Sequence, residues 1–234
     1  MSLPAGYSFA GDDGTADPSV LAALADPDER ALMAALATAR VLLPVVPLPA
    51  GEHDHDHDHD HGSVAPIATV SLVAPDGRRG MLAFSGVEAL AAWDPASRPL
   101  PAVTREAARA ALDGNFDAIV VDPRSGHERV LRPSMMWALL TGRDWLPAHL
   151  DPVVLAALSA AVGRESDVQA VTPDEGAPGA GTLLVRLGVA AGLTEGEVAD
   201  LVTRIGQRLA ADPDVRVRLD DVAFSLRPAG PPRN

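Results

Sequence analysis

The stretch Ile67–Gly86 reads IATVSLVAPDGRRGMLAFSG and carries a strong fold signal. Two apolar runs, Ile67–Val73 and Gly80–Phe84, lie on either side of the triplet Pro-Asp-Gly at 75–77. This triplet favours a tight turn, and apolar runs on both sides of a turn are typical of paired strands. The stretch therefore predicts a β-hairpin.

Helix signals precede this hairpin. Asp17-Pro18 and Asp26-Pro27 each place a capping carboxylate before a proline, which predicts two helix starts. The apolar run Val41–Leu48 then predicts a buried strand. Pro44 and Pro47 favour an edge position for this strand, because proline cannot donate to a β-ladder.

Helices and strands mix after the hairpin. Ser85 and Glu88 have the spacing of a capping box and predict a helix that contains Leu90 and Trp93. Further patterning predicts a helix Thr104–Leu112 and a strand Asp117–Val121 paired with Glu128–Leu131. A helix is also predicted from Pro133 to Gly142. Its apolar residues form core or, alternatively, a partner-binding surface; they are Met135, Met136, Trp137, Leu139 and Leu140.

A second unit follows. Asp151-Pro152 predicts a helix through Val162, and Thr194 with Glu197 predicts a capped helix that ends at Leu209. Strands are expected at 168–171 and 182–189, joined by a loop rich in glycine and proline at 173–181. Two alternating runs, Val215–Leu219 and Val222–Leu226, predict a closing hairpin around Asp220-Asp221.

These elements predict the α+β class, because strict βαβ alternation is missing. We expect a mixed sheet with packed helices in an N-terminal domain, followed by a smaller α+β C-terminal domain. The expected divisions are a disordered N-terminal segment 1–17, an N-terminal domain 18–147 with a His/Asp loop at 51–62, a C-terminal domain 148–228 and a flexible tail 229–234.

Composition rules out several kinds of chemistry. All 19 basic residues are arginine, and the chain has neither lysine nor cysteine. A Walker A phosphate loop, a Schiff base and thiol catalysis are therefore excluded. The formal net charge of −13 argues against a nucleic-acid partner, which needs a basic surface. Neither a membrane-spanning apolar run nor a signal peptide is recognisable, so we expect a cytoplasmic protein that does not bind membranes.

An alternating His-Asp tract is the most conspicuous local feature. In an extended conformation its histidines share one face and its aspartates the other. Imidazole suits zinc and nickel, and the aspartates could add ligands or offset the charge of the metal. No cofactor is required, and a catalytic metal is not expected because the tract has no fixed geometry. The candidate metal ligands are His53, His55, His57, His59 and His61.

Three interpretations of the tract remain open. It could act as a metal sensor, store or chaperone, or as a regulatory loop that responds to metal or pH. The simpler interpretation is a solvated surface loop that grew by codon repeats, since such loops tolerate insertions.

Other catalytic candidates are weak. His127 follows a turn and His149 lies in the expected linker, so either is more readily explained as a surface residue than as a general base. No serine occurs in a G-x-S-x-G elbow, and no third partner completes a triad. Asp220-Asp221 could pair for acid–base work, but a turn explains both aspartates. We therefore assign no catalytic residues.

Several motifs, taken in order, resemble the SseB-like proteins in the form common in actinobacteria. The resemblance covers about residues 20–143, and the remainder is similar to the more divergent C-terminal domain of that family. It implies no established catalytic activity and supplies no catalytic residues, and the His-Asp tract falls in a variable loop. The motifs lie at Leu42–Pro47, Ile67–Gly80, Leu82–Gly86, Ala91–Pro95, Arg105–Ala111 and Ala118–Pro123.

We therefore expect a non-enzymatic protein that acts in protein interaction or regulation, with an unidentified protein partner. One alternative is a metal-binding or metal-responsive protein that uses the His-Asp tract. A second alternative is an unrecognised enzyme with His127 or His149 in a cleft.

Calorimetric titration of zinc and nickel near neutral pH tests the metal alternative. We expect weak binding, on the order of 10 μM or above, with no fixed stoichiometry, and weaker still below the histidine pKa. A variant with the tract replaced by Gly and Ser is the control. Submicromolar affinity at a fixed small stoichiometry, abolished in that variant, would contradict this expectation and make metal handling the leading function.

Overall fold

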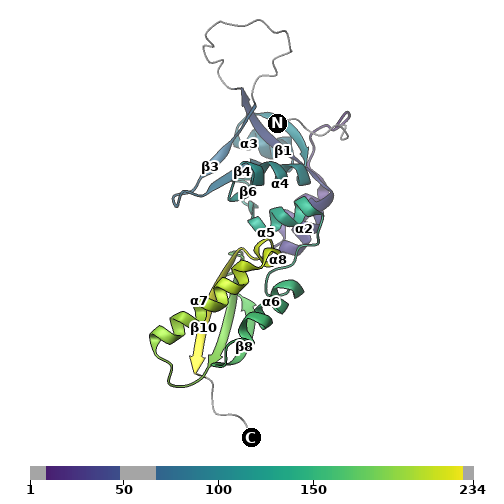
Figure 1. The fold of residues 1–234 in the computed structure, drawn as a ribbon. Helices are drawn as coiled ribbons and strands as arrows, with labels where there is room; N and C mark the ends of the chain where they lie inside the picture. Colours follow the sequence, from purple (N-terminus) through teal and green to yellow (C-terminus); the bar gives the residue numbers. More distant parts are fainter. Residues whose placement is uncertain (1–8, 48–66, 229–234) are drawn as a thin grey trace, which may run out of the picture. The chain divides into compact units, whose positions relative to one another are not determined.

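The computed structural model of the chain describes residues 9–47 and 67–228. The predicted His/Asp loop, with all five candidate metal ligands, lies outside the described residues, as do residues 1–8 and 229–234. Helices and sheets occur together, which confirms the α+β class (Figure 1). The chain divides into two compact units: unit 1 holds the residues up to Leu131 and Leu139–Gly142, and unit 2 holds Arg132–Ala138 and the residues from Arg143 onward.

The first sheet of unit 1 has the order β2-β1-β5, and its strands are antiparallel. β1 (Arg40–Pro47) is the central strand, so the predicted edge position is wrong. The register explains how its prolines are accommodated. β5 (Arg98–Val103) pairs with residues 40–45, whereas β2 (Ile67–Thr69) pairs only with residues 45–47. Pro44 thus lies opposite one strand only, at Pro99.

The predicted hairpin forms between β3 (Ser71–Val73) and β4 (Arg79–Ala83). Gly77 has a φ of +87° and donates its N–H to the Ala74 carbonyl at 2.9 Å. The first apolar run is divided, however, because β2 pairs with β1 and only β3 enters the hairpin.

The second sheet of unit 1 is mixed and has the order β3-β4-β6-β7. β4 runs parallel to β6 (Ala118–Val121), and β7 (Arg129–Leu131) pairs antiparallel with β6, as predicted. Phe84 at the end of the hairpin is fully buried, and its ring centroid lies 5.5 Å from that of Trp93.

Aspartates cap the first two helices. Asp17 accepts the Ser19 N–H at the start of α1 (Pro18–Ala25), as predicted. The second helix begins two residues later than Asp26-Pro27 predicts, because Asp28 is its N-cap and accepts the Arg30 N–H at the start of α2 (Glu29–Thr38). Later helices of the first 142 residues are α3 (Val87–Trp93), α4 (Thr104–Asp113) and α5 (Pro133–Thr141).

The capping box predicted for α3 is wrong. Gly86 is the N-cap residue and makes no side-chain cap bond. The Ser85 hydroxyl instead donates to Asp122 at 2.6 Å. In contrast, the core interpretation of α5 is confirmed, because Met135, Met136 and Leu139 are buried.

A buried carboxylate ties together four segments of unit 1. Asp122 has a φ of +48°, and its carboxylate accepts both the N–H and the hydroxyl of Ser85, at 2.7 and 2.6 Å. The Ser85 carbonyl accepts the Arg40 guanidinium at 2.5 Å. Arg40 also contacts Asp12 at 2.6 Å and the Thr15 carbonyl at 2.7 Å. The hydrogen bond from Arg40 holds the pKa of Asp12 below its ordinary value.

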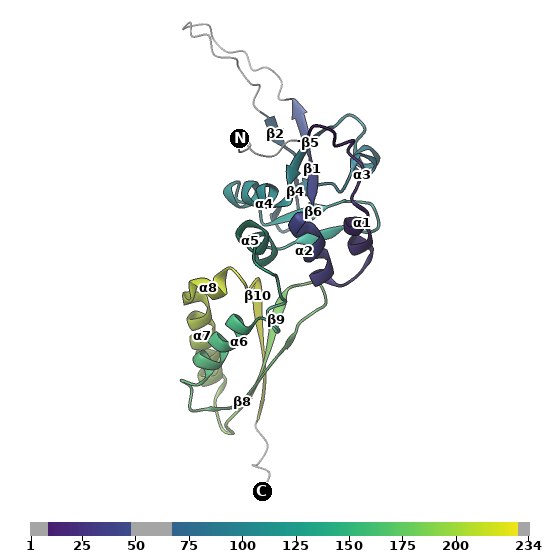
Figure 2. The same cartoon turned by 90° about the vertical axis from the view of Figure 1, so that its right-hand side faces the viewer.

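Unit 2 contains a third sheet of order β10-β9-β8 (Figure 2). β8 (Val168–Glu175) and β9 (Thr182–Val189) are antiparallel, as predicted. β10 (Asp221–Pro228) runs parallel to β9, so the predicted closing hairpin is wrong. The first run of the predicted hairpin begins inside the short helix α8 (Pro213–Arg216) instead. Asp212 caps this helix by accepting the Asp214 N–H.

Two longer helices cover one face of this sheet. They are α6 (Pro152–Val162) and α7 (Glu195–Ala211), and α7 begins with the predicted capping box of Thr194 and Glu197. Their buried residues pack with alternate residues of β9, which gives unit 2 its own core. None of the helices within the described residues is long and apolar enough to cross a membrane. The main members of this core are Val154, Leu158, Leu183, Val185, Leu187, Leu201, Ile205 and Leu209.

Glu165 joins α6 to α7 through two arginines. Its carboxylate lies 2.7 Å from Arg204 and 2.6 Å from Arg208, and Arg208 also donates to the Ala161 carbonyl at 2.8 Å. The hydrogen bond from Arg204 lowers the pKa of Glu165; desolvation opposes this shift and Arg208 adds to it.

The lowered pKa of Glu165 predicts a pH-dependent contribution to stability. The ionised form is favoured in the folded state, so the contribution is present above the unfolded-state pKa and is lost as pH falls through the folded-state pKa. At neutral pH we expect Glu165→Gln to lower the free energy of unfolding by about 1 kcal/mol. In urea unfolding the difference from wild type should shrink below about pH 4. Glu175→Gln, at an exposed position, is the control; a pH-independent Glu165→Gln effect would contradict the prediction.

Candidate functional site

The structure places the predicted catalytic histidines on separate surface positions. His127 is exposed on the turn before β7, where its backbone N–H donates to the Ser125 hydroxyl at 3.0 Å. His149 is half-buried before α6, and its charge contributes to the lowered pKa of Asp174 after the larger effect of Arg186. Within residues 9–47 and 67–228, neither imidazole has a hydrogen-bond partner that would orient it as a base. The same ranges hold no cluster of three or more His, Asp or Glu suited to a metal.

Asp220 and Asp221 do not act as a pair, because each contacts different groups. The Asp220 carboxylate accepts the Ser134 N–H and hydroxyl, both at 2.7 Å, and the Arg132 guanidinium at 3.1 Å. Asp221 is exposed and accepts the Thr182 hydroxyl at 3.2 Å. Asp220 therefore has an anchoring role, separate from that of Asp221.

The Asp220 cluster extends to an indole and to the loop between β8 and β9. The Trp145 indole N–H donates to the Ser134 hydroxyl at 3.0 Å, and Arg132 donates to the Gly179 carbonyl at 3.0 Å. Gly181 has a φ of +72°, and a Cβ there would lie 2.9 Å from an Asp220 oxygen and closer still to Arg132. A side chain at Gly181 would thus collide with the cluster. The close approach of the loop to Arg132 and Asp220 therefore explains why residue 181 is a glycine.

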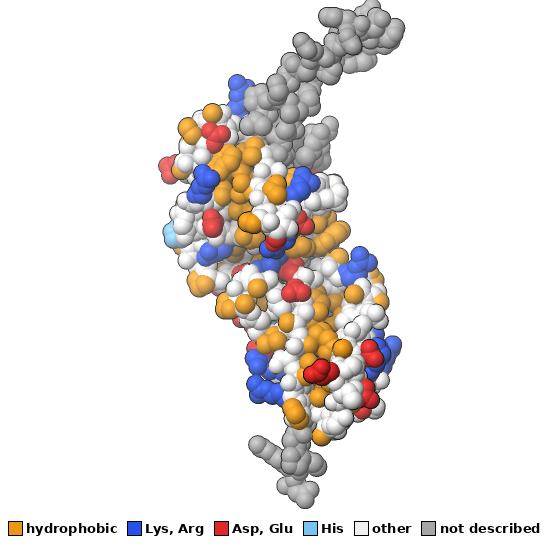
Figure 3. Space-filling model, turned by 90° about the vertical axis from the view of Figure 1, so that its left-hand side faces the viewer, with side chains coloured by type: hydrophobic (Ala, Val, Ile, Leu, Met, Phe, Trp, Pro, Cys, Tyr) orange, Lys and Arg blue, Asp and Glu red, His pale blue; other side chains and the backbone are white. Residues whose placement is uncertain are grey.

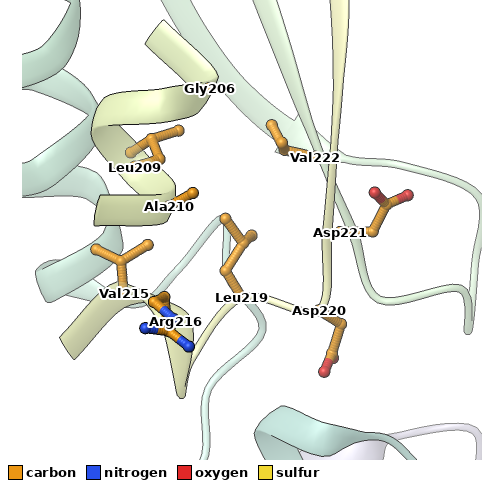
Figure 4. A pocket seen from close by; sticks show the side chains of 9 residues that line it. All are labelled: Gly206, Leu209, Ala210, Val215, Arg216, Leu219, Asp220, Asp221 and Val222. Carbon is orange, nitrogen blue, oxygen red and sulfur yellow. The ribbon is translucent and has the colours of Figure 1, made fainter. Parts of the chain in front are cut away.

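A pocket lies beside Asp220, between the end of α7, α8 and the start of β10, with a volume of about 290 Å³. Its walls are mostly apolar, with Arg216 among them, and Figure 4 shows Leu219 and Val222 directed toward the side of α7. The carboxylates of Asp220 and Asp221 point away from these walls (Figure 4). The full lining is Gly206, Leu209, Ala210, Val215, Arg216, Leu219, Asp220, Asp221 and Val222.

This arrangement suits binding of an apolar group better than acid–base chemistry. One of the two lining carboxylates, Asp220, is already held by Arg132 and Ser134. The sequence did not indicate this pocket, because Val215–Leu226 was predicted as a hairpin. The Asp212-Pro213 pair was the available signal, since an aspartate followed by proline predicts a helix start.

The mixed sheets and the packed helices define an α+β protein with a four-stranded mixed sheet in its first unit. The family model described as the SseB protein N-terminal domain matches residues 19–138, more than half of the 234 residues. The chain belongs to the SseB family, which confirms the resemblance seen in its sequence motifs. Comparisons with curated proteins and with solved structures give no match.

The neighbouring aspartates at 220 and 221 provide a matched test of the anchoring role. We expect Asp220→Ala to lower the free energy of unfolding by about 3 kcal/mol, because it removes the carboxylate that pairs with a largely buried arginine and accepts the Ser134 N–H and hydroxyl. Asp221→Ala should change it by less than about 0.5 kcal/mol, as for most exposed positions. Urea unfolding followed by circular dichroism measures both, and equal effects at the two positions would contradict the assignment.

Proposed function

We propose that this SseB-family protein acts without catalysis, in protein interaction or regulation, and that its family domain binds a partner protein through an apolar face of the β3-β4-β6-β7 sheet. The observation that carries the proposal is the exposure of Leu72 and Val130. These side chains are 40% and 50% exposed, on the two edge strands of that sheet.

Strand register places these residues on one face. Leu72 lies opposite Gly80, and Val130 lies opposite Val120, which in turn lies opposite Leu82. Directly opposed residues share a face, as do residues two apart along a strand. We call Leu72, Val120 and Val130 the apolar sheet face.

Helix α3 covers only part of this face. Leu82 is buried with Leu90 of α3, and Val120 packs at the margin of the same cluster. Leu72 and Val130 remain exposed on either side. Single exposed apolar residues are ordinary, but several in register across one sheet form a surface that a partner can cover.

The polar side chains support a non-catalytic role. The buried carboxylates of Asp122 and Glu165, and the half-buried Asp220, are each held by serine or arginine donors. A catalytic base normally has an orienting partner and a cleft shared with the reacting group. His127 and His149 have surroundings that suit surface residues instead.

Affinity capture with the full chain tests the proposal. We expect Leu72→Asp/Val130→Asp to retain at least about tenfold less of a partner protein from an extract of the source cells, because an aspartate would be buried without a donor at the contact. The matched control is Leu21→Asp, at another exposed leucine (48%) on α1. The captured partner is then purified and titrated against the wild type, the double variant and the Leu21→Asp control.

Two outcomes would overturn this proposal. The first is equal retention by the double variant and wild type, and the second is no direct binding of any purified partner to wild type. A chain with the His-Asp tract replaced by Gly and Ser serves as an additional arm. Loss of binding in that chain alone would favour the metal-responsive alternative and count against the apolar sheet face.

A further inference from the structure

We propose that two copies of this chain associate through their β10 strands, antiparallel about a two-fold axis at Phe224. The two three-stranded sheets of unit 2 would then form one six-stranded sheet. This inference concerns unit 2 and does not rest on the apolar sheet face of unit 1.

The free edge of β10 is long and regular. All eight residues of β10 pair with β9 in unbroken register, and no described residue pairs with its other edge. An edge of this kind presents N–H and C=O groups to any strand that can align with them.

The opposite edge of the same sheet, β8, is built differently. Its register is interrupted between Val168 and Ala170, Pro173 removes a backbone donor, and Asp174 forms an exposed ion pair with Arg186. Bulges, prolines and charges are the usual protections of an edge strand. Residues 222–226 of β10 contain no bulge, proline or charge.

The helix-covered face of β10 is incompletely buried. Val222, Phe224 and Leu226 are half-buried, whereas their partners on β9 (Leu183, Val185 and Leu187) are at most 1% exposed. Figure 3 shows the side of unit 2 that carries β10, with hydrophobic side chains gathered in a strip beside α7. The pocket of Figure 4 adds Leu219 and Val222 beside α7, and at Gly206 a Cβ would meet nothing within 4 Å. An added strand would bury these apolar groups.

The sequence of β10 is complementary to itself when reversed. Residues 221–227 read DVAFSLR. Antiparallel pairing centred on Phe224 places Asp221 opposite Arg227 of the second copy, and the two-fold axis generates this ion pair twice. The same register places Val222 opposite Leu226, and Ala223 opposite Ser225. Charge, apolar and small residues thus each meet a suitable partner.

This self-complementarity points to a second copy as the occupant of the edge. Arg227 is exposed and has no ion-pair partner among residues 9–47 and 67–228, so it is available for Asp221 of another chain. A two-fold contact also satisfies both edges at once, which closes the assembly as a dimer.

Charge reversal on the full chain tests the register. Sedimentation equilibrium at low salt, from about 1 to 100 μM, should show a dimer for wild type. Arg227→Asp or Asp221→Arg should each weaken association by about tenfold or more, because two attractive pairs become two repulsive pairs. The combined Asp221→Arg/Arg227→Asp chain should regain the wild-type affinity. Arg164→Asp, at an exposed position after α6, controls for net charge.

Disulfide trapping supplies a second measurement, since the chain has no cysteine of its own. A mixture of Ala223→Cys and Ser225→Cys chains should form a disulfide-linked dimer faster than either variant alone, because only the mixture places two thiols directly opposite.

Three results would overturn the proposal. They are a wild-type monomer at about 100 μM, single reversals that dimerise like wild type, and a combined variant that does not recover. Circular dichroism and thermal unfolding of every variant establish that lost association is not lost folding. None of these results depends on whether the apolar sheet face binds a partner.

Discussion

The hydrogen-bonded chain from Asp122 through Ser85 to Arg40 determines how the parts of unit 1 meet. Asp122 accepts two hydrogen bonds from Ser85, and the Ser85 carbonyl accepts one from Arg40, which also holds Asp12. A buried carboxylate is costly unless donors satisfy it, so this arrangement is possible in few geometries. It fixes the ends of β4 and β6 against the start of β1. The apolar residues of the sheet supply stability, and this polar chain supplies their orientation.

A similar hydrogen-bonded cluster around an aspartate lies in unit 2. Asp220 holds the start of α5 and Arg132 near the beginning of β10, and Trp145 joins through Ser134. Asp220 lies where the chain passes from α8 into β10, which runs parallel to β9. The pocket beside Asp220 and the open edge of β10 are consequences of that path.

Local signals predicted most elements, and long-range pairing accounts for the failures. The turn at Gly77 and the caps at Asp17 and Thr194 depend on residues within a few positions, so the sequence alone indicated them. Ser85 was misassigned because its partner, Asp122, lies 37 residues away. Val215–Leu219 alternates like a strand, but the cap at Asp212 favours a helical turn. For the candidate site, the family motifs indicated the family domain, whereas the apolar sheet face and the pocket depend on register and packing that no local pattern contains.

Every ion pair formed by a basic side chain in the described residues uses arginine, and this makes the acid and alkaline limits of the protein unequal. Acid protonates carboxylates such as Glu165 and removes their attraction to arginine. At alkaline pH far fewer side chains change charge, because the chain has no lysine and no cysteine. Arginine keeps its proton under ordinary alkaline conditions. We therefore expect the folded protein to tolerate alkaline buffers better than acidic ones, a practical guide for its purification and storage.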